Sequence, residues 1–591
     1  KKAIIFWLEK TVPFEYRKPI REGILEWNRA FEKVGFANAV EVRQQPDDAD
    51  WDPEDINYNT FRWITSNAGF AMGPSRVNPT TGEILDADII FDADFLDYWR
   101  FAYDSYGPQP KKGLPGMAMS AGDSPGAPGG LPFDSHPASP FCCDHSHGMA
   151  RQLAFGSLVF AANPPAASKA EMKKLIMQGL KETAMHEVGH TFGLRHNFKG
   201  STQLTLKQID ERAKAGGQSL CGSIMDYLPV NLVPSGQKQG DYFPQTLGPY
   251  DHWAIEYAYK TLSGGTEGEL KELKKIASRC AQPGLDYATD DDTRDQDPDP
   301  NSNRFDLGKD PLEYARRQAK LVGQLMPGLL DRMVQEGEGY QRARRAFNLL
   351  LGEHNQAMLL TARFVGGVYV HRDHKGDPKG RPPFVVVDAK RQREALDTLK
   401  QEVFAPDSYV FPTVLYNYLA PSKWSHWGIS SKDRSDYPVH ETVLNWQNRI
   451  LSRLLATTTL SRLIDSELKV PAEQDAFTAA ELLEGLTAAV YAETEELDDG
   501  KYSNRKPAIS SLRRSLQREY LGRLSNLAMG NTSAPDDCQT VAYVELEALE
   551  ARIKQVLAGK ARLDTYTRAH LEETAARIGK VLDARLQLRT P

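Results

Sequence analysis

Hydrophobic positions follow two different periods over the first hundred residues. Short stretches rich in β-branched and aromatic residues predict strands at 3–9, 39–45, 61–66 and 82–95. Between the first two strands, hydrophobic residues recur at steps of three and four, namely Ile20, Ile24, Trp27, Phe31 and Val34. That spacing places one apolar stripe on a helix that ends near Gly35. A strand, a helix and then several strands predict an α/β sheet.

The pattern changes twice farther along the chain. Residues from about 105 to 140 are rich in Gly, Pro and Ser, which argues against regular structure and predicts a long surface insertion. A helix without proline is predicted from about Ser168 to the histidine-rich stretch near residue 190. After about residue 310, charged and leucine-rich stretches have a helical period, interrupted by a predicted hairpin at 368–388. The C-terminal half is therefore expected to be mainly helical.

Composition narrows the class of protein. With 40% hydrophobic and 26% charged residues, the chain of 591 residues is typical of a globular protein with several domains. A formal net charge of -7 leaves no evident basic surface for phosphate groups, so we expect no nucleic-acid partner. No apolar run approaches the roughly 18 to 20 residues that a spanning helix needs, so we expect no membrane span.

The N-terminus and the cysteines bear on processing and compartment. The sequence begins KKAIIFWLEK, without an initiator Met or a signal-like apolar segment, so we expect a processed or truncated product. The number of cysteines is small and odd. One or two disulfides would suit a secreted protein, but the pairing stays open among Cys142, Cys143, Cys221, Cys280 and Cys538.

Three of the 13 histidines fall within the stretch HEVGHTFGLRH. His186 and His190 are four residues apart, so on a helix they point the same way and can bind one ion. Glu187 follows the first of them, where its carboxylate can reach a water molecule held by the ion. Gly193 tolerates the left-handed backbone of a sharp turn, which brings His196 round as a third ligand.

Three imidazoles and one open position are typical of a catalytic zinc site, since structural sites fill all four positions and favour cysteine. A zinc ion lowers the pKa of its bound water to about 7 and polarises a substrate carbonyl. Glu187 can take the water's proton and pass it to the leaving amine, so these residues predict hydrolysis of a peptide bond. The alternative is a helix end rich in histidine by chance, and the spacing of Gly193 and His196 argues against it.

The sequence resembles the metzincin zinc endopeptidases, whose signature H-E-x-x-H-x-x-G-x-x-H is matched at every fixed position. Farther on, CGSIMDYLP is similar to the methionine-containing turn of that family, which implies that Met225 is an apolar floor beneath the metal. Tyr227 matches a position where some branches carry a tyrosine that approaches the zinc or stabilises the oxyanion. Asn197 follows the third histidine, where well-known branches carry other residues, so the resemblance implies no particular branch.

The resemblance covers about residues 1–265 and looks most like the large bacterial zinc-dependent metalloproteases with a long C-terminal extension. It implies an α/β metzincin-type catalytic domain with a mixed twisted sheet, an active-site helix and the Met-turn. Within it, 82–95 is expected to include the substrate-side edge strand, and 247–260 the helix after the Met-turn. We expect an acidic linker at 266–310 and a mainly α-helical C-terminal domain at 311–591.

Two weaker signals concern further metal ions. Residues 290–310 concentrate carboxylates and turn-forming residues, which would suit Ca²⁺, although the spacing does not match an EF-hand loop. A solvated acidic loop is the alternative. The stretch CCDHSH at 142–147 offers a second zinc site or a disulfide anchor, but adjacent cysteines do not easily bind one ion together.

Together these signals predict a secreted or periplasmic bacterial zinc endopeptidase that acts on protein or peptide substrates. His186, His190 and His196 would bind one Zn²⁺, with Glu187 and Tyr227 as the catalytic residues. One alternative is a non-catalytic protein that uses the zinc fold to bind a partner, although Glu187 would then have no chemical task. The other is a metal-dependent amidase that acts on cell-wall peptides.

Overall fold

A computed structural model describes residues 2–65, 71–93, 145–162, 169–233, 236–421, 434–495, 497, 500–559 and 561–584. The predicted insertion at about 105–140 and the adjacent Cys142 and Cys143 lie outside these residues. The other three cysteines, Cys221, Cys280 and Cys538, are buried and free, so no disulfide joins them. In the part of the chain that is described, no helix is both long enough and apolar enough to cross a membrane.

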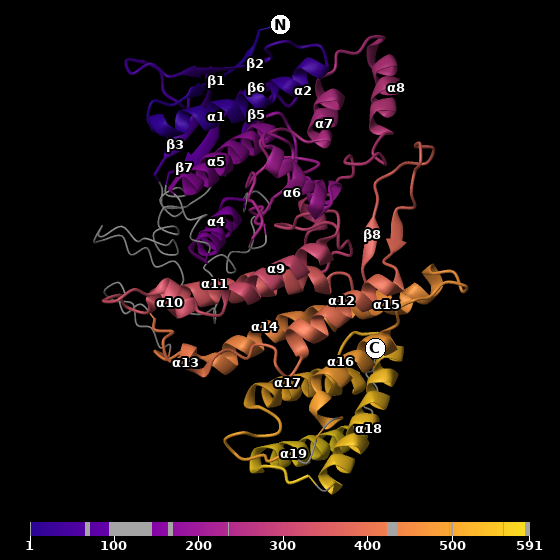
Figure 1. The fold of residues 1–591 in the computed structure, drawn as a ribbon. Coiled ribbons are helices and arrows are strands. Elements are labelled where there is room, and N and C mark those ends of the chain that lie inside the picture. The colour runs from indigo at the N-terminus through magenta and orange to yellow at the C-terminus, as the bar shows by residue number, and fades with distance from the viewer. Residues whose placement is uncertain are drawn as a thin grey trace.

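A five-stranded sheet forms the N-terminal region, as the α/β prediction requires (Figure 1). Its order is β2-β1-β3-β7-β4, and each neighbouring pair is parallel except the antiparallel pair β7 and β4. The strands are β1 (Ile4–Leu8), β2 (Val40–Gln44), β3 (Asn59–Ile64), β4 (Ala71–Met72) and β7 (Ile89–Asp92). A second, two-stranded sheet joins β5 (Ser75–Val77) and β6 (Ile84–Ala87).

The edge strand expected within 82–95 was placed wrongly. This stretch divides at Asp88, whose carboxylate accepts hydrogen bonds from Thr60 N at 3.0 Å and Thr60 Oγ1 at 2.7 Å. β6 precedes Asp88 and belongs to the small sheet, whereas β7 follows it and lies inside the large sheet. The edge is β4, and a strand of two residues is too short to carry an alternating pattern that the sequence could reveal.

Helices α1 (Phe14–Glu26) and α5 (Lys169–Thr191) pack closely together beside this sheet (Figure 1). A side chain at Gly23 of α1 would collide with the backbone of Lys181 and with Ala184 of α5, so glycine permits the close approach. Trp27 donates a hydrogen bond from Nε1 to Met185 O at 2.9 Å. The helix predicted to end near Gly35 is divided at Trp27 into α1 and α2 (Asn28–Lys33).

The remaining elements are almost all helical within the described residues. Between the N-terminal sheet and residue 310 they are α4 (His145–Ala162), α6 (Leu206–Ala215), α7 (Pro249–Tyr259) and α8 (Gly265–Ala277), with short 3₁₀ turns at Gly200–Gln203 and Asp290–Asp292. Beyond it they are α9 (Pro311–Leu325), α10 (Leu329–Met333), α11 (Gln341–Ala362), α12 (Ala389–Leu399), a π-helical turn at Lys400–Phe404, α13 (Thr413–Tyr416), α14 (Val439–Leu454), α15 (Thr457–Lys469), α16 (Ala479–Val490), a 3₁₀ turn at Ala492–Thr494, α17 (Ser511–Ala528), α18 (Asp536–Ala558) and α19 (Thr565–Leu582). β8 (Val368–Val370) and β9 (Phe384–Val386) pair antiparallel, where the sequence predicts a hairpin.

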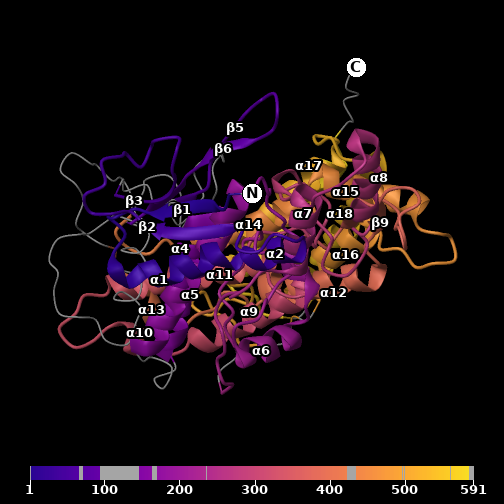
Figure 2. The same cartoon turned by 90° about the horizontal axis from the view of Figure 1, so that it is seen from above.

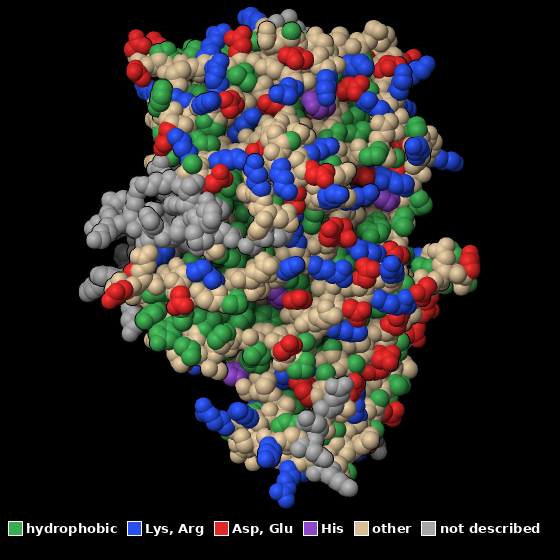
Figure 3. Space-filling model, in the orientation of Figure 1, with side chains coloured by type: hydrophobic (Ala, Val, Ile, Leu, Met, Phe, Trp, Pro, Cys, Tyr) green, Lys and Arg blue, Asp and Glu red, His purple; other side chains and the backbone are tan. Residues whose placement is uncertain are grey.

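The layers of the molecule share one hydrophobic core. Figure 1 shows the sheet with α1 and α5 at one end, the long helices α9, α11 and α14 across the middle, and α16 to α19 at the other end, and Figure 2 shows the same arrangement from above. One cluster of buried side chains runs through all of these layers. The domain boundaries near residues 265 and 311 stay a prediction. On the face drawn in Figure 3, both signs of charge are interspersed.

Candidate metal centre

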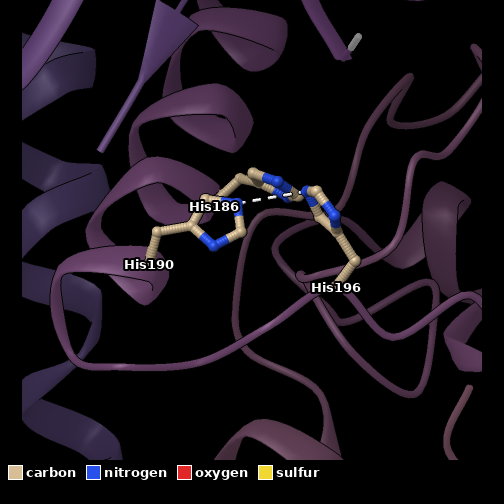
Figure 4. Close-up of side chains that lie close together, drawn as sticks. All are labelled: His186, His190 and His196. Carbon is tan, nitrogen blue, oxygen red and sulfur yellow. Dashed lines mark hydrogen bonds between the residues drawn. The ribbon is translucent and has the colours of Figure 1, made fainter. Parts of the chain in front are cut away.

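The C-terminal end of α5 and the turn after it bring three imidazole rings together (Figure 4). His186 and His190 project from the last turns of the helix. Gly193 has φ +86°, and its N–H donates to His190 O at 2.9 Å, so the chain reverses there and returns His196 to the other two rings. The potential ligand atoms of the three histidines all lie within 4.8 Å of one another.

Each ring is oriented by a hydrogen bond at Nδ1. Nδ1 of His186 lies 2.8 Å from Ile224 O, and Nδ1 of His190 lies 2.9 Å from Leu194 O. Nδ1 of His196 lies 2.9 Å from both carboxylate oxygens of Asp290. Carbonyl and carboxylate oxygens only accept, so Nδ1 carries the hydrogen in each ring and Nε2 of a neutral ring carries the lone pair.

The geometry of the Nε2 atoms fits a zinc ion. Nε2 of His190 and Nε2 of His196 are 3.2 Å apart (Figure 4). Two nitrogens bound at about 2.0–2.1 Å to a tetrahedral zinc ion would lie about 3.3 Å apart. Because both atoms carry lone pairs when the rings are neutral, they repel each other at this distance unless a cation lies between them. The donor set and its orientation therefore suit Zn²⁺.

Met225 lies directly beneath the helix that carries the first two histidines. It is fully buried, and a side chain at Gly189, in the turn between His186 and His190, would collide with its sulfur atom and with the ring of Trp27. Asn197 N donates to Met225 O at 2.9 Å, which joins the third-histidine loop to the same turn. The Met-turn thus contacts both elements that carry histidines.

Asp251 on α7 holds the Met-turn in place, a role that the sequence did not reveal. Its buried carboxylate accepts hydrogen bonds from Ser223 Oγ at 2.7 Å, Ile224 N at 2.9 Å and Gly248 N at 2.7 Å. Burial raises the pKa of Asp251 to about 6, although these hydrogen bonds oppose the shift. Since Ile224 O is the partner of His186, Asp251 supports that ring through a single residue.

Asp290 supports the third histidine, and it too was missed as a site residue. It also accepts from Arg304 at 3.2 Å. Partial burial acts to raise the pKa of Asp290, but the hydrogen bond from His196 and the charge of Arg304 outweigh it and lower the pKa to about 2. The acidic run that contains Asp290 is visible in the sequence. What the sequence lacks is a signal that one of its carboxylates reaches back to His196.

Two carboxylates of the acidic segment at 290–310 give no support to the calcium expectation. Asp297 pairs with Arg294 at 3.4 Å, and the buried Asp299 pairs with Lys199 at 2.8 Å. Cations of the chain itself therefore neutralise these carboxylates. Among the described residues, the three histidines are the single group of three or more His, Cys, Asp or Glu side chains placed to hold one ion.

Glu187 and Tyr227 lie beside the histidines. Glu187 is fully buried on α5, and a side chain at Gly73, just after the edge strand β4, would collide with its carbonyl oxygen. The ring of Tyr227 is buried, with its centroid 4.7 Å from that of His196 and 5.5 Å from that of His186. The guanidinium of Arg304 lies 5.7 Å from the Tyr227 ring centroid. All the predicted site residues thus gather at one place.

The α/β region, the histidine turn and the methionine beneath it define a metalloprotein of the metzincin type. A family model described as Met-zincin matches residues 168–497, more than half of the chain, and the chain therefore belongs to the Met-zincin family. Family and site together indicate a zinc metallopeptidase. No curated protein and no solved structure matches the chain.

Proposed function

We propose that this protein is a zinc-dependent endopeptidase. The proposal is carried by the three imidazoles, each fixed at Nδ1 by an oxygen, with two Nε2 atoms 3.2 Å apart. Three side chains are the number of protein ligands typical of a catalytic zinc site, whereas structural sites have four. When bound there, zinc makes a water molecule acidic and polarises a peptide carbonyl.

In this proposal Glu187 is the general base and then the general acid. Its carboxylate takes a proton from the attacking water as the water oxygen bonds to the peptide carbon, and it delivers that proton to the amide nitrogen as the C–N bond breaks. Two observations support the assignment. Glu187 directly follows His186 on the same helix, and its burial excludes bulk water from the proton transfer.

Tyr227 is proposed to stabilise the oxyanion. Its ring lies against His196, and the hydroxyl of a tyrosine in this place can donate a hydrogen bond to the negative charge that develops on the carbonyl oxygen. The Arg304 guanidinium over the ring adds a positive charge nearby. These groups would bind the transition state more strongly than the neutral substrate carbonyl.

Strand β4 is proposed to bind the substrate. It is an edge strand of the five-stranded sheet within the described residues, and the chain just after it contacts α5 at Glu187. An extended peptide that pairs with the outer edge of β4 would therefore pass beside the histidines, with backbone hydrogen bonds that do not depend on side-chain identity. Unfolded proteins and flexible peptide segments are the expected substrates.

A Glu187→Gln variant tests the proposal. We expect peptide-bond hydrolysis to fall by about 10²- to 10⁴-fold while the zinc content stays that of the wild type. Glu211→Gln, an exposed position on α6, is the matched control and should retain full activity. Wild-type protein that carries zinc but cleaves no unfolded protein would favour the zinc-fold binding protein, and cleavage of cell-wall peptides alone would favour the amidase.

The location of the protein is also a proposal. Secretion or export to the bacterial periplasm fits the resemblance to large bacterial metalloproteases. Fractionation of the producing cells, with an antibody against this chain, would locate the protein. Recovery with the cytoplasmic fraction would contradict the proposal.

A further inference from the structure

Asp226 of the Met-turn and Asp306 form a pair of buried carboxylates that is separate from the three histidines. Asp226 stands between Met225 and Tyr227, and Asp306 directly follows Phe305, whose N–H donates to Tyr227 O at 2.8 Å. Both aspartates are 0% exposed. Isolated carboxylates are rare in protein interiors because removing the charge from water is costly, so such a pair needs a compensating partner.

Only one oxygen of each carboxylate has a donor. Asp226 Oδ2 accepts from Ser201 N at 2.7 Å, and Asp306 Oδ2 accepts from Asn303 Nδ2 at 2.9 Å. The other oxygen of each, Oδ1, has no hydrogen-bond partner, and the same holds for Asn303 Oδ1. Ser201 is 0% exposed and Asn303 3% exposed. Three buried acceptor oxygens without donors in one region indicate an ion or molecule that the protein alone does not supply.

These oxygens belong to side chains that are close neighbours. Burial raises the pKa of both carboxyl groups well above the ordinary range, and the charge of Asp306 raises that of Asp226 further. The Ser201 hydroxyl acts to lower both pKa values, so it lies beside both carboxylates. Gly308 N donates to Ser201 O at 3.2 Å, which joins the segment that contains Asn303 and Asp306 directly to the segment that contains Ser201.

The cations of the chain near this pair are directed elsewhere. Arg363 is the positive group that acts on Asp306, but its guanidinium donates to the carbonyl oxygens of Asp299 and Ser302, at 3.0 Å and 3.1 Å. Lys199 is paired with Asp299. No salt bridge is present between either carboxylate of the pair and a Lys, Arg or His within the described ranges.

We propose that Asp226, Asp306, Asn303 and Ser201 form a second metal site that binds one Ca²⁺. Carboxylate, amide and hydroxyl oxygens are the ligands that this ion prefers, and its two charges balance the two carboxylates. Mg²⁺ fits less well because it usually retains several waters in an octahedral shell. Zinc is disfavoured since the group has no nitrogen or sulfur ligand.

The proposed ion would connect three segments that surround the catalytic centre. Ser201 follows the loop of the third histidine, Asp226 belongs to the Met-turn, and Asn303 and Asp306 come from the segment whose Phe305 packs on Tyr227. By neutralising the carboxylates it would hold Tyr227 and Met225 in register with the histidines. The ion therefore has a structural task, distinct from that of zinc.

Metal analysis and thermal unfolding of the full zinc-loaded chain test this site. After passage through metal-free buffer, wild-type protein is titrated separately with CaCl₂ and MgCl₂. We expect about one bound calcium per chain in addition to zinc, and a higher thermal midpoint with Ca²⁺ than with Mg²⁺. Asp306→Asn keeps the side-chain shape but removes one charge, and it should lose the bound calcium and the calcium-dependent rise while retaining zinc.

Asp295→Asn is the control variant for this experiment. Asp295→Asn alters an exposed carboxylate of the same acidic segment and should bind calcium as the wild type does. If wild-type protein holds zinc alone and its thermal midpoint does not respond to millimolar calcium, the site does not exist and the pair shares a proton. That result needs no variant, so a misfolded Asp306→Asn protein would not obscure it, and it leaves the zinc site untouched.

Discussion

At the scale of single residues, the orientation of two of the three zinc ligands depends on groups far away in the chain. His190 is fixed locally by Leu194 O, but the oxygen that fixes His186 is 38 residues away, and the oxygen that fixes His196 belongs to Asp290, 94 residues away. A carboxylate on Nδ1 fixes the tautomer and makes Nε2 a stronger electron donor. Such a partner changes metal affinity without touching the metal.

Replacing Asp290 should weaken zinc binding. Asp290→Asn removes the negative charge and one of the two acceptor oxygens near His196, so we expect the zinc dissociation constant to rise by about 10- to 100-fold. Competition with a chromogenic chelator measures this constant. Asp291→Asn is the control, because Asp291 is 70% exposed and pairs only weakly with Arg195 at 3.5 Å. Equal affinity in Asp290→Asn and wild type would show that the hydrogen bond is dispensable.

At the scale of elements, the contact between α5 and the Met-turn aligns the histidines with their floor. The contact is tight because Gly189 has no side chain, which lets Met225 reach the helix backbone. Gly522, on the exposed side of α17, has no neighbour within 4 Å of the place a side chain would occupy. The two helical glycines therefore allow the effect of crowding to be separated from that of helix propensity.

Alanine at these two glycines should have opposite effects. We expect Gly189→Ala to lower the free energy of unfolding by about 1–3 kcal/mol because the new methyl group crowds Met225 and Trp27. Gly522→Ala should raise it by about 0.5–1 kcal/mol. Denaturant titration measures both. Combining Gly189→Ala with Met225→Ala should cost less than the sum of the two single changes, and strict additivity would argue against the contact.

The parts of the fold foreseen from the sequence are those whose signals are local. The helix before the histidines, the turn at Gly193 and the helix after the Met-turn each follow from periodicity or from a short motif. Strand β4 has two residues, and the contacts of Asp251 and Asp290 depend on how distant segments pack, so no local pattern contains them. The edge strand was wrongly predicted within 82–95 because this stretch contains two strands that pair with different partners.

At the scale of the whole molecule, a continuous core joins the metal-binding half to the C-terminal helices. His570 on α19 is a suitable probe of the C-terminal helices because it is buried among them. Its side chain is 2% exposed, and its Nε2 lies 2.8 Å from Gln517 Oε1. Burial, and then the charges of Arg518, Arg514 and Arg577, lower the pKa of His570 to about 3. The folded protein therefore keeps this ring neutral where an unfolded chain would protonate it.

The C-terminal helices should lose stability in mild acid. As the pH falls below about 6.5, the ordinary pKa of histidine, the unfolded state gains a proton that the folded state does not, until the pH reaches about 3. The contribution of His570 to the free energy of unfolding is thus fully present above pH 6.5, and below that pH it falls by about 1.4 kcal/mol per pH unit.

Thermal unfolding between pH 4.5 and 7.5 measures this dependence. His570→Gln should have a shallower decline than the wild type over this range, since glutamine takes up no proton in either state. His440→Gln, at an exposed position on α14, should decline as the wild type does. Parallel curves for His570→Gln and wild type would mean that this histidine is charged in the folded protein.

The central claim is that three histidines bind one zinc ion and leave one position for a reactive water. X-ray absorption at the zinc edge, on the zinc-loaded full chain, measures this coordination directly. The account predicts three imidazole nitrogens and one further oxygen, all at about 2.0–2.1 Å. A sulfur ligand at about 2.3 Å, or a shell completed by a fourth protein side chain, would contradict it.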